Sequence, residues 1–294
     1  MCIATSLLRI HLGRDWRWTK ENRDENYLKI VSRFEDIKTA PYGIHQIGSF
    51  GVDSGKQIGE WFSPNVIAQV LKKLVRFDEF SNLTVSVALD HQLATEEILD
   101  QQNSTKFTPI LIIVPLRLGL GELNPIYIDG LKKILELKST VGIIGGRPNQ
   151  ALYFFGYADD EILFLDPHTC QRSGSVGNKE TQAEIEIDET YHQRSAGKMA
   201  FSAMDPSIAV SFLCETRQEF DDLIKQLETK DGKTPLFEVI KSRAAPWVSA
   251  SSSMSSSRDL EQDLNAICGE QQPTEDFEEV IKEENSEDEF EIIE

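Results

Sequence analysis

The feature that most constrains the fold is an unbroken apolar run over residues 110–116. A strand that is apolar at every position is typical of one buried on both faces of a sheet. Three further apolar segments follow at 141–144, 152–157 and 162–165, joined by short turns that contain Gly or Asp. We expect these segments to be three successive strands, so the middle of the chain is predicted to be rich in sheet.

Helices are predicted on both sides of this region. The spacing of apolar residues predicts helices over 2–12 and 27–37, and Ser63-Pro64 is a helix start with Ser as N-cap. The remaining predicted elements are a strand over 83–88, a helix over 125–137, a strand over 208–214 and a helix over 218–227. This mixed order, without strict strand–helix alternation, predicts the α+β class.

The negative charge is concentrated near the C-terminus. The 294 residues carry a net charge of −19, and residues 248–294 hold 15 acidic and two basic residues, which leaves −6 for the rest. We therefore expect a folded domain over 1–247 and a disordered, Ser-rich and acidic tail over 248–294, because that tail has too little apolar surface to fold. This charge disfavours a nucleic-acid partner, and no apolar run is long enough for a transmembrane segment.

The clearest candidate for chemistry is Asp166-Pro-His168, which follows the third predicted strand. Residues two apart on an extended chain face the same side, which allows a carboxylate to orient an imidazole. A catalytic His needs such a partner, together with a Ser or Cys nucleophile from elsewhere. The alternative is an ordinary turn at a strand end, where Asp and Pro are common.

Three other sequence segments have patterns that resemble binding sites. The Gly-rich segment 142–149 is either a binding loop or a tight connection between strands. Residues 48–57 lack the spacing of a phosphate-binding loop, and we interpret them as a flexible loop. Phe290 and Ile293 lie three apart among acidic residues, a pattern that fits a peptide added to a sheet edge but also arises by chance.

Taken together, these segments resemble the autophagins, the autophagy-related protein 4 family of cysteine peptidases. The matching motifs include His-Leu-Gly-Arg-Asp-Trp-Arg-Trp at 11–18 and Leu-Asp-Pro-His-Thr at 165–169. Further matches occur in family order at 44–47, 55–62, 64–74, 114–119, 145–149 and 205–209. The resemblance implies a papain-like fold, a cytoplasmic location and no metal or cofactor. It also implies cleavage of ubiquitin-like modifiers of the autophagy-related protein 8 type after a C-terminal Gly, and their release from phosphatidylethanolamine on membranes.

The resemblance also assigns roles to individual residues. His168 is then the general base and acid, and Asp166 orients it. Phe107 corresponds to a gating aromatic residue, and the segment from His192 to Gly197 to a cover over the active site. The motif from Phe290 to Ile293 is then a modifier-docking site.

One family feature is missing from the sequence. The family nucleophile lies in a Gly-Trp-Gly-Cys motif, which does not occur in this chain. In the family this motif lies at the start of the helix that leads into the segment matched at 11–18. Cys2 falls further along that helix, about 12 Å from the expected position at about 1.5 Å per residue. Cys170 matches no family nucleophile, Cys214 is expected to be structural, and Cys268 lies in the tail. We therefore expect an N-terminally truncated peptidase domain, and the alternatives are a short form that only binds the modifier and a folded chain without function.

Overall fold

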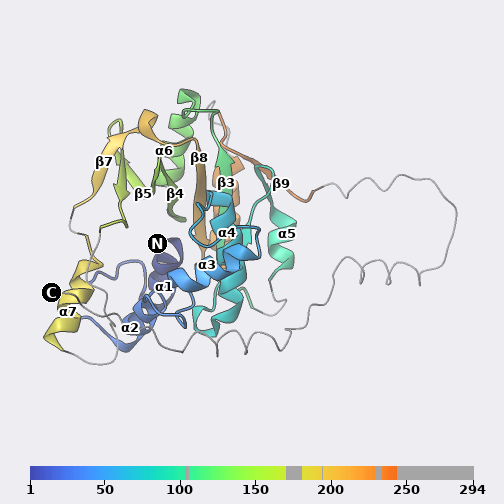
Figure 1. Ribbon diagram of the computed structural model, residues 1–294. Helices are drawn as coiled ribbons and strands as arrows, with labels where there is room; N and C mark the ends of the chain where they lie inside the picture. The colour runs from blue at the N-terminus through green and yellow to red at the C-terminus, as the bar shows by residue number, and fades with distance from the viewer. Residues whose placement is uncertain (103–105, 170–180, 194, 229–233, 244–294) are drawn as a thin grey trace. The chain divides into compact units, whose positions relative to one another are not determined.

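A seven-stranded sheet forms the centre of the computed structural model, which describes residues 1–102, 106–169, 181–193, 195–228 and 234–243 (Figure 1). Its strand order is β1-β3-β8-β4-β5-β6-β7, in which β1 and β3 are parallel and all other neighbours are antiparallel. In this order the strands are β1 (Thr84–Val87), β3 (Ile110–Arg117), β8 (Ser207–Cys214), β4 (Thr140–Arg147), β5 (Gln150–Ala158), β6 (Glu161–Leu165) and β7 (Gly197–Ala200). A separate parallel pair joins β2 (Gln92–Ala94) to β9 (Glu238–Ile240).

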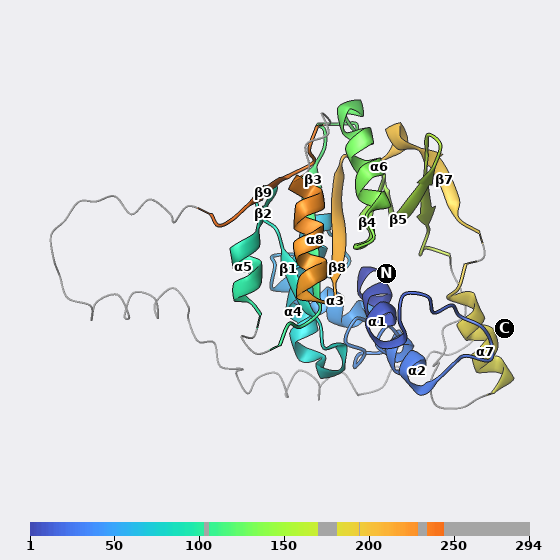
Figure 2. The same cartoon turned by 180° about the vertical axis from the view of Figure 1, so that it is seen from behind.

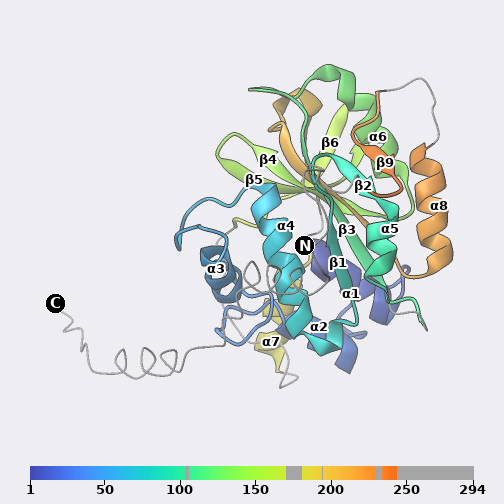
Figure 3. The same cartoon turned by 90° about the vertical axis from the view of Figure 1, so that its right-hand side faces the viewer.

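Helices cover both faces of the sheet. The helices are α1 (Cys2–Leu12), α2 (Glu25–Ser32), α3 (Ile44–Val52), α4 (Pro64–Leu74), α5 (Thr95–Asp100), α6 (Ile128–Glu136), α7 (Gln182–Thr190) and α8 (Arg217–Glu228). Helices α1 and α4 pack on one face, and α6 and α8 lie on the other, as the reverse view and the side view show (Figures 2 and 3). The predicted α+β class is therefore confirmed.

Strand β3 is buried from both sides, as the apolar run predicts. Residues 110–114 are 0% exposed, and their side chains alternate between the two cores. Ile110 and Ile112 belong to the core under α6 and α8, whereas Leu111 and Ile113 belong to the core under α1 and α4. Each such side chain contributes about 1.5–3 kcal/mol through burial, so β3 ties the two cores together.

Two helix predictions are wrong in part. The helix expected over 27–37 is α2, which begins after its N-cap Asp24 and ends at Ser32. Arg33 is its C-cap, and the Arg33 side chain binds Asp78 at 3.0 Å. Of the segment interpreted as a flexible loop, residues 48–52 are helical and form the end of α3, whereas 53–57 are not. Its Gly51 is buried because the ring of Phe62 lies where a Cβ atom would be.

The fold described here runs to Arg243. The expected domain boundary at residue 247 and the expected docking motif of Phe290 and Ile293 lie outside the described residues, as do Cys170 and Cys268. Within the described part of the chain, no helix is long and apolar enough to cross a membrane.

Candidate active site

The Asp-His pair lies at one end of the sheet, beside the turn that joins β4 to β5. Strand β6 pairs with β5 up to Tyr153 and Leu165, and Asp166 follows directly. The antiparallel register brings Gln150, the first residue of β5, to the same end of the sheet. The segment that leads into β8 lies here too, since the backbone N–H of Asp205 donates to the carbonyl oxygen of Gly146 at 2.8 Å.

Asp166 and His168 form the contact that their spacing predicts. His168 Nδ1 lies 2.7 Å from Asp166 Oδ1, and the His168 backbone N–H donates to the same oxygen at 3.0 Å. Because an ionised carboxylate only accepts, Nδ1 carries the proton and Nε2 is left to act as a base. The backbone and side-chain hydrogen bonds from His168 hold the pKa of Asp166 below its usual value, so the carboxylate is ionised at neutral pH.

Two glutamines that the sequence analysis missed hold Asp166 from opposite sides. Gln150 Nε2 donates to Asp166 Oδ2 at 2.5 Å, and Gln193 Nε2 donates to the Asp166 backbone oxygen at 3.0 Å. Arg147 Nε in turn donates to Gln150 Oε1 at 2.6 Å. The pair is therefore embedded in a set of directed hydrogen bonds.

The structure brings the expected cover segment alongside the pair. Gly197 pairs with Phe164 of β6, and Gln193 contacts Asp166 as described. His192 stacks on Trp18 with ring centroids 4.6 Å apart, and its Nε2 lies 2.7 Å from the Tyr27 hydroxyl. His192 thus fastens this segment to Trp18, before α2, and to Tyr27, within it.

A buried carboxylate anchors helix α7, which directly precedes this segment. Asp188 of α7 is 0% exposed and accepts hydrogen bonds from Trp18 Nε1 at 3.1 Å, Arg23 Nε at 2.5 Å and the Tyr27 hydroxyl. Burial alone raises the pKa of Asp188, but the hydrogen bonds from His192, Tyr27, Trp18 and Arg23 outweigh it and hold that pKa below its usual value. This charged cluster fixes α7 against the chain between α1 and α2.

Phe107 is not brought to the pair. It precedes β3, is half-buried and packs against the core under α6 and α8. Antiparallel pairing puts Ile110 opposite Cys214 and Arg117 opposite Ser207. The pair lies at the Ser207 end of the sheet, whereas Phe107 lies at the other end.

Neither cysteine in the described part of the chain has the features of a nucleophile. Cys2 is 3% exposed, and its Sγ lies 3.2 Å from the Oγ of Ser211, which donates to the Gly142 carbonyl oxygen at 2.6 Å. Burial raises the pKa of Cys2, and it raises that of Cys214 to about 12. Both thiols therefore stay protonated at neutral pH, whereas a nucleophilic cysteine needs a lowered pKa.

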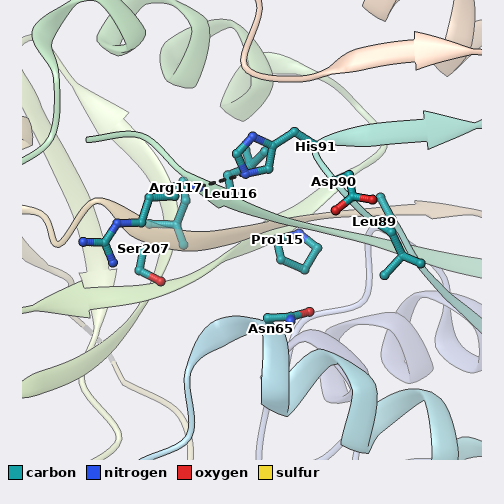
Figure 4. A pocket seen from close by; sticks show the side chains of 10 residues that line it. Asn65, Leu89, Asp90, His91, Pro115, Leu116, Arg117 and Ser207 are labelled. Carbon is teal, nitrogen blue, oxygen red and sulfur yellow. Dashed lines mark hydrogen bonds between the residues drawn. The ribbon is translucent and has the colours of Figure 1, made fainter. Parts of the chain in front are cut away.

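A cavity of about 280 Å³ opens near the Ser207 end of the sheet (Figure 4). His91 Nε2 accepts the backbone N–H of Arg117 at 3.3 Å, and Asn65 faces them from the first turn of α4. Ser207, which also lines the cavity, is tied to Asp205 through its backbone N–H at 2.8 Å. The segment 205–207 thus contacts both the cavity, through Ser207, and the β4–β5 turn, through Asp205.

Comparison with known proteins agrees with this geometry. The family model of the peptidase C54 catalytic domain matches residues 1–226 of this chain. Cysteine protease ATG4B of Xenopus laevis is 39% identical over 267 residues, which cover 82% of this chain and 68% of that protein. ATG4B of Gallus gallus is 38% identical over 278 residues (82% and 70%), and cysteine protease ATG4A of Homo sapiens is 36% identical over 280 residues (84% and 69%).

The fold and these matches define a papain-like, cysteine-type peptidase. Over most of its length the chain belongs to the peptidase C54 family, which confirms the resemblance to the autophagins.

Proposed function

We propose that the protein is a cytoplasmic cysteine endopeptidase that cleaves ubiquitin-like modifiers of the autophagy-related protein 8 type after a C-terminal Gly. The observation that carries this proposal is the contact of 2.7 Å between His168 Nδ1 and Asp166 Oδ1. In the proposed reaction His168 Nε2 takes the proton of a nucleophilic thiol, which neither Cys2 nor Cys214 supplies, as the sulfur attacks the Gly carbonyl carbon. The C–N bond then breaks as His168 gives that proton to the leaving amine, and water hydrolyses the thioester to release the Gly carboxylate and the thiol. Asp166 keeps the imidazole in the required tautomer and stabilises its charged form.

The same chemistry extends to release from membranes. A modifier conjugated to phosphatidylethanolamine is joined through an amide of its terminal Gly, so the bond that breaks is again an amide at that carbonyl carbon. We propose that the conjugate is a second substrate of the same site.

Exposed apolar side chains close in sequence to residues that line the cavity support a protein substrate. Leu120, close in sequence to Arg117 of the cavity, is 91% exposed, and Trp61, which precedes α4, is 60% exposed. Docking of the modifier to Phe290 and Ile293 remains a prediction.

A second candidate function is compatible with one observation, the burial of both described thiols, Cys2 and Cys214. In this alternative the chain binds the modifier but does not cleave it. The acid–base pair is then present without an accessible nucleophile beside it.

The test is to incubate the purified chain with a modifier precursor that extends beyond its Gly, and to analyse the products by mass spectrometry. Cleavage after the Gly that is lost in His168→Ala supports the first function. The matched control is His45→Ala, because His45 is also an exposed His close to a carboxylate, with Nε2 3.2 Å from Asp36 Oδ1. Binding without cleavage, weakened by Phe290→Ala/Ile293→Ala, supports the second function, and the absence of both contradicts both.

A further inference from the structure

Only one orientation of the Gln150 side-chain amide satisfies its two hydrogen bonds. Arg147 has only donors, so the Gln150 side-chain oxygen faces its guanidinium at 2.6 Å. The Gln150 amide nitrogen must then face the other way, where it donates to Asp166 Oδ2 at 2.5 Å. The orientation of the Gln150 amide is therefore set by two charged neighbours of opposite sign.

The two oxygens of the Asp166 carboxylate have different partners. Oδ1 accepts both hydrogen bonds from His168, and Oδ2 accepts the one from Gln150. Rotation of the carboxylate about its own bond would break contacts on both sides. Gln150 thus fixes the plane of the carboxylate, while His168 sets its direction.

The backbone at the β4–β5 turn is held tightly enough to place Gln150. Asn149 adopts a φ of 64°, in the left-handed region, which turns the chain back on itself. Gly146 packs so closely that a Cβ atom would lie 2.1 Å from the Gln150 carbonyl oxygen, and its own carbonyl accepts the Asp205 N–H. The turn therefore has little freedom to shift without moving the Gln150 side chain.

We propose that Gln150 is a positioning residue that fixes the plane of the Asp166 carboxylate and couples the acid–base pair to the β4–β5 turn through Arg147. Its importance for catalysis rests on the proposed function, whereas the coupling itself is a property of this fold. Gln150 acts through Asp166 and does not itself need to touch the substrate.

The test measures the titration of Asp166 by carbon NMR in the full chain and in Gln150→Leu. Loss of the Gln150 donor shifts the midpoint of Asp166 upward, because one hydrogen bond to the ionised form is gone. The matched control is Gln218→Leu in α8, which also removes a bond from a Gln amide to an Asp carboxylate, at 3.0 Å from Asp222 Oδ1. That control leaves the midpoint of Asp166 unchanged.

Two further variants keep the proposal testable if Gln150→Leu fails to fold. Gln150→Glu keeps the shape but puts a carboxylate against Asp166, so the two groups titrate as a coupled pair with one midpoint raised. Arg147→Leu shifts the midpoint of Asp166 in the same direction as Gln150→Leu but by less. In the double variant, the shift equals that of Gln150→Leu alone, since Arg147 acts through Gln150.

Nitrogen NMR of the His168 ring gives a readout that a purely structural role would not change. The Nδ1–H tautomer predominates in the natural chain, and Gln150→Leu increases the share of the other tautomer. Unchanged Asp166 and His168 signals in folded Gln150→Leu and Gln150→Glu would overturn the proposal. Both readouts are independent of cleavage, so a chain that does not cut the modifier contradicts the proposed function and leaves this inference standing.

Discussion

Replacing Asp188 by Ala removes a fully buried carboxylate that accepts hydrogen bonds from Trp18, Arg23 and Tyr27. The Arg23 side chain is only 7% exposed, so the variant leaves a buried positive charge without its partner. Breaking one side of a buried ion pair costs about 3–5 kcal/mol, and a domain has about 5–15 kcal/mol of unfolding free energy in total. We therefore expect Asp188→Ala to lose a large part of the stability of the domain.

Equilibrium unfolding in urea, followed by circular dichroism, measures this loss. The matched control is Asp160→Ala, because Asp160 is 99% exposed and pairs with Lys132 at 2.9 Å. An exposed pair of this kind contributes about 0–1 kcal/mol. A loss below about 1 kcal/mol in Asp188→Ala would refute the reasoning, since a buried anchor would then be no more important than a surface pair.

Asp188→Ala should also change how the unfolding free energy depends on pH. The pKa of Asp188 is lowered in the folded protein, so its stabilising contribution is complete above the unfolded pKa of about 3.9 and is lost as the pH falls through the folded value. The unfolding free energy of the natural chain should therefore fall more steeply in this acid range than that of Asp188→Ala. Equal slopes in the two proteins would contradict the assignment.

Three further predictions concern the thiols, the core and the turn. Cys2 and Cys214 should resist alkylation by iodoacetamide at neutral pH and react once the chain is unfolded in urea, because both are buried with raised pKa values; rapid native labelling at either position would contradict this. Phe154→Ala, at a position that is 0% exposed, should cost about 3–5 kcal/mol in the same urea assay, and a cost below about 1 kcal/mol would show that the core collapses around the change. Gly146→Ala should raise amide hydrogen exchange in the β4–β5 turn, because its Cβ would meet the Gln150 carbonyl oxygen at 2.1 Å; unchanged protection there would mean that the turn adapts.

The parts of the fold that were predictable depend on local chemistry. The apolar run became β3 because a strand buried on both faces needs apolar residues at every position. Helix α4 begins at Pro64, with Ser63 Oγ accepting the Val66 N–H at 3.3 Å, as its capping residues predict. The contact between Asp166 and His168 is one that their spacing allows.

The missed parts depend on contacts between distant segments. Gln150 contacts Asp166 only because β5 and β6 pair in one particular register, and the sequence alone does not give that register. Helix α7 has a capping box at Thr181, but its anchor Asp188 finds its partners far away in the sequence, before and within α2. The position of Phe107 at the far end of β3 is likewise set by sheet pairing and not by proximity in sequence.

The location of the substrate at the acid–base pair is tested most directly by NMR titration of the His168 ring signals with a modifier that ends in Gly. We expect these signals to shift as the modifier is added, together with those of the Gln150 side-chain amide. A modifier that lacks its last few residues should leave them unchanged, and the His45 ring signals should not move in either experiment. Saturable binding of the modifier without any change at His168 would contradict the account, because the terminal Gly would then not reach the pair.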